Sequence, residues 1–205
     1  DGYQVAYSTD VDGNPIYTDG MSADDKYTAA KKAALGYFAA AGYTVSGDKI
    51  TEAPKGAPME AEIMIGGGGN GDHPSYGILT DAKAALGELG FTLDINDLAD
   101  GATMWDVLDA NTNQLWCAAW QATPDPDMYQ VYYSSNAVGK GGTNSNHYNI
   151  ADSDLDDMIM EARTSDDQEY RKQLYKQCLD TILDWAVEIP IYQRQNCTIY
   201  SVERV

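Results

Sequence analysis

The apolar positions near the start of the chain recur with the period of a helix. Five of them lie three or four positions apart: Tyr27, Ala30, Ala34, Phe38 and Ala41. This spacing predicts an amphipathic helix. Ser22 with Asp25 resembles the capping box of a helix start, and Gly42 is typical of a helix end. The turn-rich residues 1–21 predict an extended N-terminal segment, and residues 43–51 predict a tight hairpin.

The middle of the chain alternates between strand and helix patterns. The apolar run at 61–65 predicts a strand, the spacing within 82–89 predicts a helix, and the alternation at 91–95 predicts a second strand. Such a βαβ unit pairs its strands in parallel. A further helix over 104–108 precedes the nearly unbroken apolar run 114–120, which predicts a strand buried on both faces. The expected fold class is therefore α/β, a mixed sheet covered by helices on two sides.

The last third of the chain is mostly helical in pattern. Two apolar faces follow at helical spacing: Leu155, Met158, Ile159 and Ala162 in the first, and Tyr170, Leu174, Cys178, Ile182 and Trp185 in the second. Asp152 or Ser153 is expected to cap the first helix. Ser165 is expected to cap the second, which Pro190 bounds. The residues 189–201 then predict one or two closing strands.

The charge of the chain changes which partners are expected. Acidic residues outnumber basic ones by 32 to 13, which gives a formal net charge of −19. A negative field repels phosphate backbones and anionic lipid surfaces, so we expect no nucleic acid as a partner and no direct membrane insertion. The sequence has no apolar run of about 18 residues, the length that a membrane-spanning helix needs.

Length and cysteine content complete the outline. With 205 residues the chain can form one substantial core, so we treat 1–205 as a single lobe with 149–205 as its helical C-terminal part. The sequence starts without Met and is expected to be a fragment of a longer protein. Cys117, Cys178 and Cys197 are widely spaced, and we expect small buried apolar residues rather than a disulfide framework or metal site.

The strongest enzyme-like pattern is glycine-rich. Gly66, Gly68 and Gly71 satisfy Gly-x-Gly-x-x-Gly after a predicted strand, and Asp94 is expected at the end of the next strand. In a dinucleotide site such glycines let the backbone approach a pyrophosphate, while the acid binds the ribose. Here residues 72–77 separate the motif from the expected helix, which favours a flexible loop. A Rossmann-type nucleotide-binding enzyme is the alternative.

Other side chains that bind metals or catalyse reactions lack the required spacing. The acidic run 152–157 has Asp157 and Arg163 where an EF-hand loop needs Gly and Glu. These acids are instead expected to stabilise a helix start. His73 and His147 have no second ligand at metal spacing, and no Gly-x-Ser-x-Gly motif is present. We therefore expect no metal, no cofactor and no catalytic residue.

The segment after the run 114–120 is the best candidate for a binding site. A polar turn with two prolines follows Trp120, and Asp127 is placed to cap a short helix rich in tyrosine. In open α/β sheets, ligands bind at the carboxyl ends of strands. Trp120, Gln121 and Thr123 would then face a cleft. The alternative is that Trp120 belongs to the core and the prolines only shape the turn.

Four motifs, in order along the chain, resemble the family 5 solute-binding proteins of ABC importers. They are Ala-Ala-Gly-Tyr at 40–43, the helix end and strand at 86–95, Pro-Asp-Pro-Asp at 124–127, and the stretch 149–192 that ends in Ile-Pro-Ile-Tyr. The likeness covers the chain from about residue 22 to 200. Members of this family deliver oligopeptides, dipeptides, nickel complexes and some sugars.

The resemblance implies one lobe of a two-lobed, type II periplasmic-binding-protein-like fold, similar to domain 3 of dipeptide-binding proteins. It implies a small solute as ligand, with an oligopeptide favoured, and an ABC transporter permease as partner. It also implies a monomer without enzymatic activity, located outside the cytoplasm in the periplasm or lipid-anchored on the outer face of the cell membrane. A purely structural or adhesive surface domain is a further alternative.

One position departs from the pattern of the peptide-binding members. In those proteins an acid shortly after the tryptophan pairs with the amino terminus of the peptide, whereas Thr123 stands at that position here. A hydroxyl cannot neutralise a buried ammonium. Either Asp125 has taken this role or the ligand is not a free peptide amino terminus. The predicted ligand-binding residues are thus Trp120, Gln121, Thr123 and Asp125.

Overall fold

Helix α1 starts and ends where its sequence predicts. The computed structural model describes residues 6–121, 123–193, 195 and 197–204, and α1 spans Ala23–Ala40. The Ser22 hydroxyl accepts a hydrogen bond from the Asp25 N–H at 3.1 Å, and the Asp25 carboxylate accepts one from the Ser22 N–H. Gly42 follows with φ of +91°, a conformation that favours glycine. The capping box and the helix end are both confirmed.

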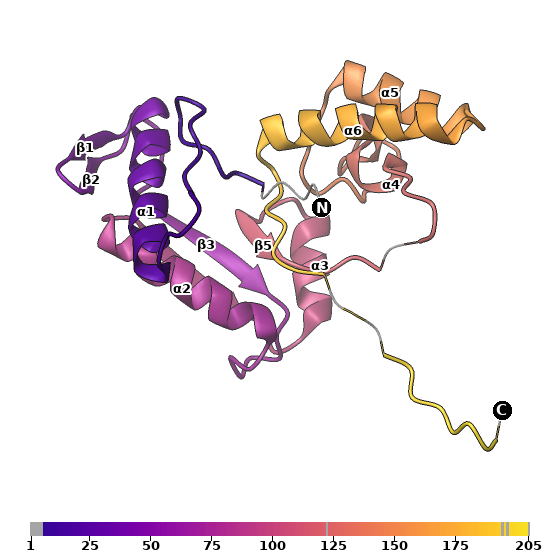
Figure 1. The fold of residues 1–205 in the computed structure, drawn as a ribbon, viewed down its shortest axis with the longest axis horizontal. Helices are drawn as coiled ribbons and strands as arrows, with labels where there is room; N and C mark the ends of the chain where they lie inside the picture. The colour runs from indigo at the N-terminus through magenta and orange to yellow at the C-terminus, as the bar shows by residue number, and fades with distance from the viewer. Residues whose placement is uncertain (1–5, 122, 194, 196, 205) are drawn as a thin grey trace.

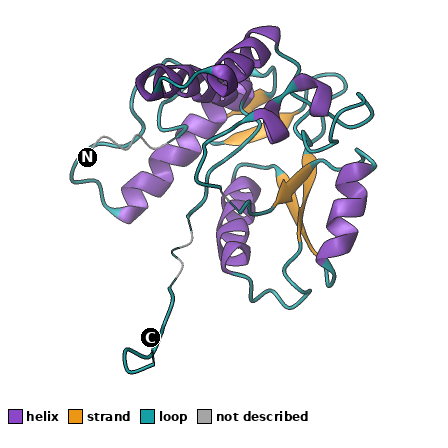
Figure 2. Ribbon diagram, turned by 90° about the vertical axis from the view of Figure 1, so that its right-hand side faces the viewer, coloured by secondary structure: helices purple, strands orange, loops and turns teal. Residues whose placement is uncertain are grey.

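A hairpin and a parallel sheet follow α1. Their elements are β1 (Thr44–Ser46), β2 (Lys49–Glu52), β3 (Glu60–Ile65), α2 (Pro74–Glu88), β4 (Thr92–Asp97), α3 (Gly101–Asp109) and β5 (Leu115–Cys117). The first two strands form the antiparallel hairpin, and β3 pairs in parallel with β4 on one side and β5 on the other. Right-handed crossovers in opposite directions place α2 and α3 on opposite faces of the sheet, and Figure 2 shows its strands with a helix on each side. The predicted βαβ unit is confirmed.

The C-terminal half is a separate helical layer. It contains α4 (Tyr129–Tyr132), the 3-10 turn η1 (Ser134–Asn136), α5 (Ser153–Thr164) and α6 (Gln168–Trp185). Figure 1 shows α5 and α6 side by side, across the molecule from α1 and α2. Their predicted apolar faces meet, with Leu155, Ile159 and Cys178 completely buried between them. Each half therefore has its own apolar core.

The cap of α5 agrees with the sequence-based prediction, and the cap of α6 differs from it. Of the two predicted candidates, Asp152 caps α5 by accepting hydrogen bonds from two backbone N–H groups. Helix α6 is capped by Asp167, not by Ser165. The Ser165 hydroxyl instead accepts a hydrogen bond from the Asp167 N–H at 3.2 Å. The predicted cap was wrong by two residues because an acid nearer the first turn also accepts backbone N–H groups.

Strand β5 is shorter and more exposed than the run 114–120 predicts. Its register pairs Ile65 with Cys117, and β3 ends at Ile65, so no partner remains for the residues beyond Cys117. Leu115 is 45% exposed because β5 is an edge strand among the described residues. The prediction of a strand buried on both faces was wrong.

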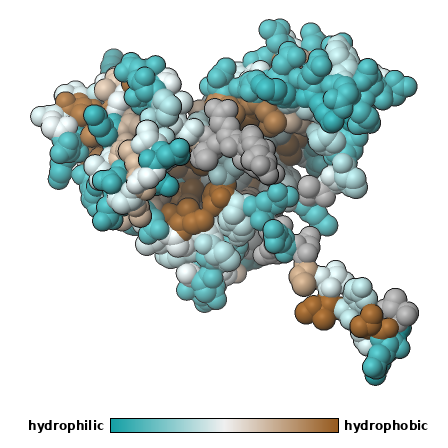
Figure 3. All heavy atoms as spheres, viewed as in Figure 1, coloured by the Kyte–Doolittle hydropathy of each residue, from teal (hydrophilic) through white to brown (hydrophobic). Residues whose placement is uncertain are grey.

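The two ends of the chain contain little regular structure. Residues 6–21 hold one isolated bridge, between Thr9 and Pro15, and residues 1–5 of the predicted N-terminal segment lie outside the described residues. No described residue after 185 belongs to a strand, so the predicted closing strands are absent there. We call residues 186–193, 195 and 197–204 the tail. In Figure 1 it first runs from α6 past β5, and only its last part, 197–204, extends away from the molecule; Figure 3 shows apolar side chains exposed along that part. An apolar segment forms a strand only beside a sheet edge, and no described edge pairs with the tail.

The three cysteines lie in different environments. Cys178 is buried, Cys117 is partly buried and Cys197 is exposed, and all three are free thiols. Burial raises the pKa of the Cys178 thiol to about 11. The expectation of small buried residues is confirmed for Cys178 and wrong for Cys197, which lies on the tail.

Candidate ligand-binding site

We call the segment after β5, residues 118–121 and 123–127, the ligand-binding turn; it contains the four predicted ligand-binding residues and follows the carboxyl end of β5. The glycine-rich loop, residues 66–73, follows the carboxyl end of β3. Since β3 and β5 are parallel neighbours, both segments lie at the same edge of the sheet. The carboxyl ends of the strands are where open α/β sheets bind their ligands.

Trp120 lies at the surface of this edge. Its side chain is 46% exposed, and its ring packs against Trp105 of α3 with a centroid distance of 5.9 Å. Gln121 and Thr123 are exposed as well. The Thr123 hydroxyl donates a hydrogen bond to the backbone carbonyl of Asp125 at 2.9 Å, so it stabilises the turn. An exposed indole beside two polar residues suits a ligand-binding surface, and this assignment stays a prediction.

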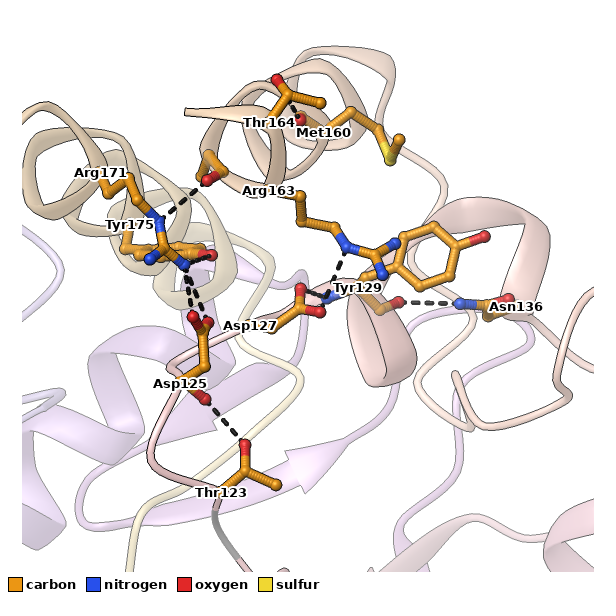
Figure 4. A network of polar contacts seen from close by, with 11 residues as sticks. Thr123, Asp125, Asp127, Tyr129, Asn136, Met160, Arg163, Thr164, Arg171 and Tyr175 are labelled. Atoms are coloured by element: carbon orange, nitrogen blue, oxygen red, sulfur yellow. Dashed lines mark hydrogen bonds and ion pairs between the residues drawn. The ribbon is translucent and has the colours of Figure 1, made fainter. Parts of the chain in front are cut away.

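Asp125 is held by an arginine of α6. One nitrogen of the Arg171 guanidinium donates to both carboxylate oxygens of Asp125, at 2.9 and 2.8 Å (Figure 4). The Arg171 Nε donates to the backbone carbonyl of Ala162 at 3.0 Å, at the end of α5. This ion pair raises the pKa of Arg171 above its ordinary value. The carboxylate of Asp125 therefore already has a cationic partner within the chain.

Asp127 attaches the same turn to α5. Its carboxylate pairs with the Arg163 Nε at 3.2 Å and accepts a hydrogen bond from the Tyr129 N–H at 3.0 Å. The Arg163 guanidinium lies over the Tyr129 ring, 4.2 Å from its centroid (Figure 4). The N-cap of α4 is Met128, which makes no side-chain cap hydrogen bond, so the predicted cap at Asp127 was wrong by one residue. The two acids of the Pro-Asp-Pro-Asp motif fix the turn to α5 and α6.

The glycine-rich loop binds a carboxylate of its own chain. Asp97, at the end of β4, accepts hydrogen bonds from the Gly67 N–H at 3.0 Å and from the Gly71 N–H at 2.8 Å. A Cβ atom on Gly67 would lie 2.6 Å from the Asp97 Oδ1, so this close approach requires glycine. The backbone amides that a phosphate would need are occupied by a negative group.

The dinucleotide-binding alternative is contradicted by this geometry. Helix α2 begins at Pro74, after the loop, so its amino terminus is not part of the glycine motif. Asp94 lies within β4 opposite Glu62 and pairs with Lys83 at 3.4 Å, away from the carboxyl end of the sheet. A Rossmann site needs an open glycine loop and a free acid at the strand end. Here the acid at the end of β4, Asp97, is itself bound to the loop.

Replacing Asp97 with alanine is expected to release the glycine-rich loop. Hydrogen bonds from backbone amides hold the pKa of Asp97 below its ordinary value, and the hydrogen bond from Gly71 has the largest effect. The Asp97 carboxylate therefore contributes its full stabilisation at pH values above the ordinary carboxyl pKa. This stabilisation is lost as the pH falls through the lowered pKa of Asp97 in the folded protein. Hydrogen exchange at neutral pH should show faster exchange of the Gly67 and Gly71 amides in the variant.

The matched control for this prediction is Asp94→Ala, which removes an exposed carboxylate from the same strand. Its loop amides should exchange as in the unmodified protein. The melting temperatures of the Asp97→Ala variant and the unmodified protein should also converge in strong acid. Equal exchange rates in all three proteins would show that Asp97 does not order the loop.

Comparison with known proteins identifies the fold. No protein-family model matches the sequence, and neither does any curated protein. Solved structures do match. NikZ from Campylobacter jejuni in complex with Ni(L-His) matches with a TM-score of 0.60 at 20% identity, over 78% of this chain and 30% of that one. The oligopeptide-binding protein AppA from Bacillus subtilis, in complex with a nonapeptide, matches with a TM-score of 0.60 at 14% identity, over 90% of this chain and 35% of that one.

The murein tripeptide-binding protein MppA, in its unliganded open form, matches with a TM-score of 0.58 at 17% identity, over 85% of this chain and 30% of that one. The chain has the fold of one lobe of a type II solute-binding protein. It spans about a third of the length of the proteins that it matches. The resemblance to family 5 solute-binding proteins is thus confirmed at the level of the fold.

An aromatic cluster beside the turn was not predicted from the sequence. We define it as Trp105, Trp116, Trp120, Tyr132, His147 and Tyr148. The Tyr132 and Tyr148 rings are stacked, with centroids 5.5 Å apart and planes within 9°. The cluster joins the sheet half of the lobe to its helical half. Its members come from separate elements, so no sequence spacing indicates that they meet.

His147 is the most buried member of this cluster. It is 6% exposed, its ring lies 5.8 Å from that of Trp105, and its Nδ1 atom has no hydrogen-bond partner among the described residues.

No group of three or more His, Cys, Asp or Glu side chains in the described parts of the lobe is arranged to hold a metal ion. The acidic run after Ile150 serves as the start of α5, where Asp152 also accepts a hydrogen bond from the Trp185 indole at 3.1 Å.

The helices of the lobe were also compared with the length and apolarity needed to cross a bilayer. Within the described ranges, none of them satisfies both conditions.

Proposed function

We propose that this chain is the ligand-binding lobe of an extracytoplasmic solute-binding protein that delivers a small solute to an ABC transporter. The observation that carries the proposal is the turn after β5. It presents Trp120, Gln121 and Thr123 at the carboxyl edge of the sheet, while Asp125 and Asp127 hold it to the helical half. A rigid turn with an exposed indole is suited to binding a ligand without large rearrangement.

The mechanism that we propose is closure of two lobes around the ligand, with this turn as one wall of the cleft. Removal of the ligand from water would then supply most of the affinity. The matched proteins are complexes with Ni(L-His) and with a nonapeptide, among others. We favour an oligopeptide for this chain. In this proposal the protein is a monomer that catalyses no reaction. It is located outside the cytoplasm, either in the periplasm or lipid-anchored on the outer face of the cell membrane.

Replacing Trp120 with alanine tests this proposal. Calorimetry with a tripeptide pool, on the full-length protein with both lobes, should show binding that is weaker by about tenfold to a hundredfold in the variant, because aromatic anchors dominate such contacts. Tyr27→Ala is the matched control, since it removes an exposed aromatic side chain from α1. Equal binding by the Trp120 variant and the unmodified protein would refute this site.

A further inference from the structure

We propose that Tyr7, Glu188 and Tyr132 form a latch that limits the orientations which the two lobes of the full-length protein adopt relative to each other. This inference rests on the proposed function, because it requires a second lobe that closes over this one. It goes further by naming the contact in this lobe that restricts the movement. The latch joins the segment before α1 to the tail and to α4.

Two hydrogen bonds make up the latch. The Tyr7 hydroxyl donates to the Glu188 backbone carbonyl at 2.7 Å, and the Tyr132 hydroxyl donates to the Glu188 Oε2 at 2.6 Å. Glu188 lies three residues after the end of α6 at Trp185. The start of the tail is therefore fixed to α4 through a side chain and to the N-terminal segment through its backbone.

The N-terminal segment is also attached to α1. The Tyr37 hydroxyl lies within hydrogen-bond distance of the backbone carbonyls of Thr9 and Asp10, at 3.0 and 3.1 Å. Tyr7, two residues before Thr9, contacts Glu188. In Figure 1 this segment crosses from α1 to the start of the tail. It thus connects the sheet half of the lobe to the helical half, and the latch is its attachment to the helical half.

The backbone beside the latch has a conformation that side chains disfavour. Tyr7 and Ala186 have φ angles of +55° and +52°, in the left-handed region. A residue other than glycine remains in this region where the surrounding contacts hold it there. Hinges between domains consist of a few loop or element-terminal residues that absorb changes of φ and ψ. Release of the latch would free both residues, so the two segments would leave the lobe in a wider range of directions.

The two phenols of the latch keep their protons at neutral pH. Burial, and then the negative charge of Glu188, raises the pKa of Tyr7 above its ordinary value. Burial and the hydrogen bond to Glu188 raise the pKa of Tyr132 as well. Both hydroxyls are therefore donors. The bond from Tyr132 to the carboxylate is charge-assisted, so it is stronger than a bond between neutral groups.

Single-molecule fluorescence energy transfer on the full-length protein tests the latch, with one dye replacing the exposed Lys55 and the other on the second lobe. Tyr7→Phe removes only the hydroxyl that reaches Glu188. We expect a wider distribution of distances between the lobes in the variant without peptide. Binding of a tripeptide pool should weaken by about threefold to tenfold, because orientations that cannot close lower the fraction of protein ready to bind.

The matched control is Tyr17→Phe, in the same N-terminal segment. Tyr17 is 39% exposed against 38% for Tyr7, and its hydroxyl makes no hydrogen bond to any residue that the structure describes. Glu188→Ala breaks the latch on its other side, since it removes the acceptor of Tyr132 and keeps the carbonyl that accepts from Tyr7. The two bonds connect the N-terminal segment to α4 in series, so combining this change with Tyr7→Phe should add little.

An unchanged distance distribution in Tyr7→Phe, or an equal change in Tyr17→Phe, would overturn the inference. Fully additive effects of Tyr7→Phe and Glu188→Ala would also overturn it, because bonds in series are not independent. The proposed function is judged by other results. If the unmodified protein binds no tripeptide while Tyr7→Phe widens the distribution, the ligand assignment fails and the latch stands. If peptide binds and the distribution of Tyr7→Phe is unchanged, the proposed function stands and the latch fails.

Discussion

Replacing Leu155 with alanine is expected to destabilise the helical half by about 3 kcal/mol, because truncating a buried leucine removes apolar burial and leaves a cavity. Leu155 is 0% exposed and lies in the core between α5 and α6, beside Ile159 and Cys178. The arginines that hold the ligand-binding turn belong to these two helices. Loss of their packing should therefore also loosen the turn.

Urea unfolding followed by circular dichroism measures this effect. Leu179→Ala is the matched control, because Leu179 lies on α6 but is 50% exposed. The control should change the free energy of unfolding by less than about 1 kcal/mol, as is usual for surface substitutions. If both variants unfold at the same urea concentration, the interface between α5 and α6 does not determine the stability of this half.

Replacing Asn146 with alanine is expected to cost about 2 kcal/mol, the usual penalty for leaving buried polar groups without a partner. The Asn146 side chain is fully buried, and its amide donates to the backbone carbonyls of Ile150 at 3.0 Å and Tyr133 at 3.2 Å. It connects the segment after α4 to the start of α5. His147 and Tyr148 follow directly in sequence, so this amide also positions the aromatic cluster.

Thermal unfolding and tryptophan fluorescence together test this role. Thr143→Ala is the matched control, because the Thr143 side chain is exposed and only its backbone N–H bonds to Asn136. We expect the Asn146 variant to melt at a lower temperature and to show altered emission from the tryptophans of the cluster. An unchanged melting temperature would mean that water replaces the lost hydrogen bonds.

The sequence was most informative where structure depends on near neighbours. The capping box of α1 and the Asp152 cap of α5 join residues no more than three positions apart. The first was predicted correctly, and the second is one of the two caps that the sequence offers, Asp152 and Ser153. The βαβ unit was equally accessible, because hydrophobic period and crossover handedness leave few topologies. The cap of α6 was misplaced at Ser165 because several nearby polar side chains compete for the same backbone N–H groups.

The glycine motif shows why a local pattern does not establish a site. Gly66, Gly68 and Gly71 match a dinucleotide fingerprint by spacing alone. The acid that determines the state of this loop is Asp97, which lies 26 positions after Gly71. Its carboxylate is brought to the loop by the parallel pairing of β3 and β4. Sequence reasoning selected Asp94 instead, which lies within the strand.

By itself, the sequence determined the class of fold, the positions of the main helices and the edge of the sheet where a ligand is expected, because these follow from periodicity and short-range hydrogen bonding. Only the tertiary structure decided which partner each acidic side chain binds. Asp125 meets Arg171 across 46 positions, and Tyr132 meets Glu188 across 56. Contacts at such separations depend on how the sheet and helical halves pack, and no spacing along the chain encodes them.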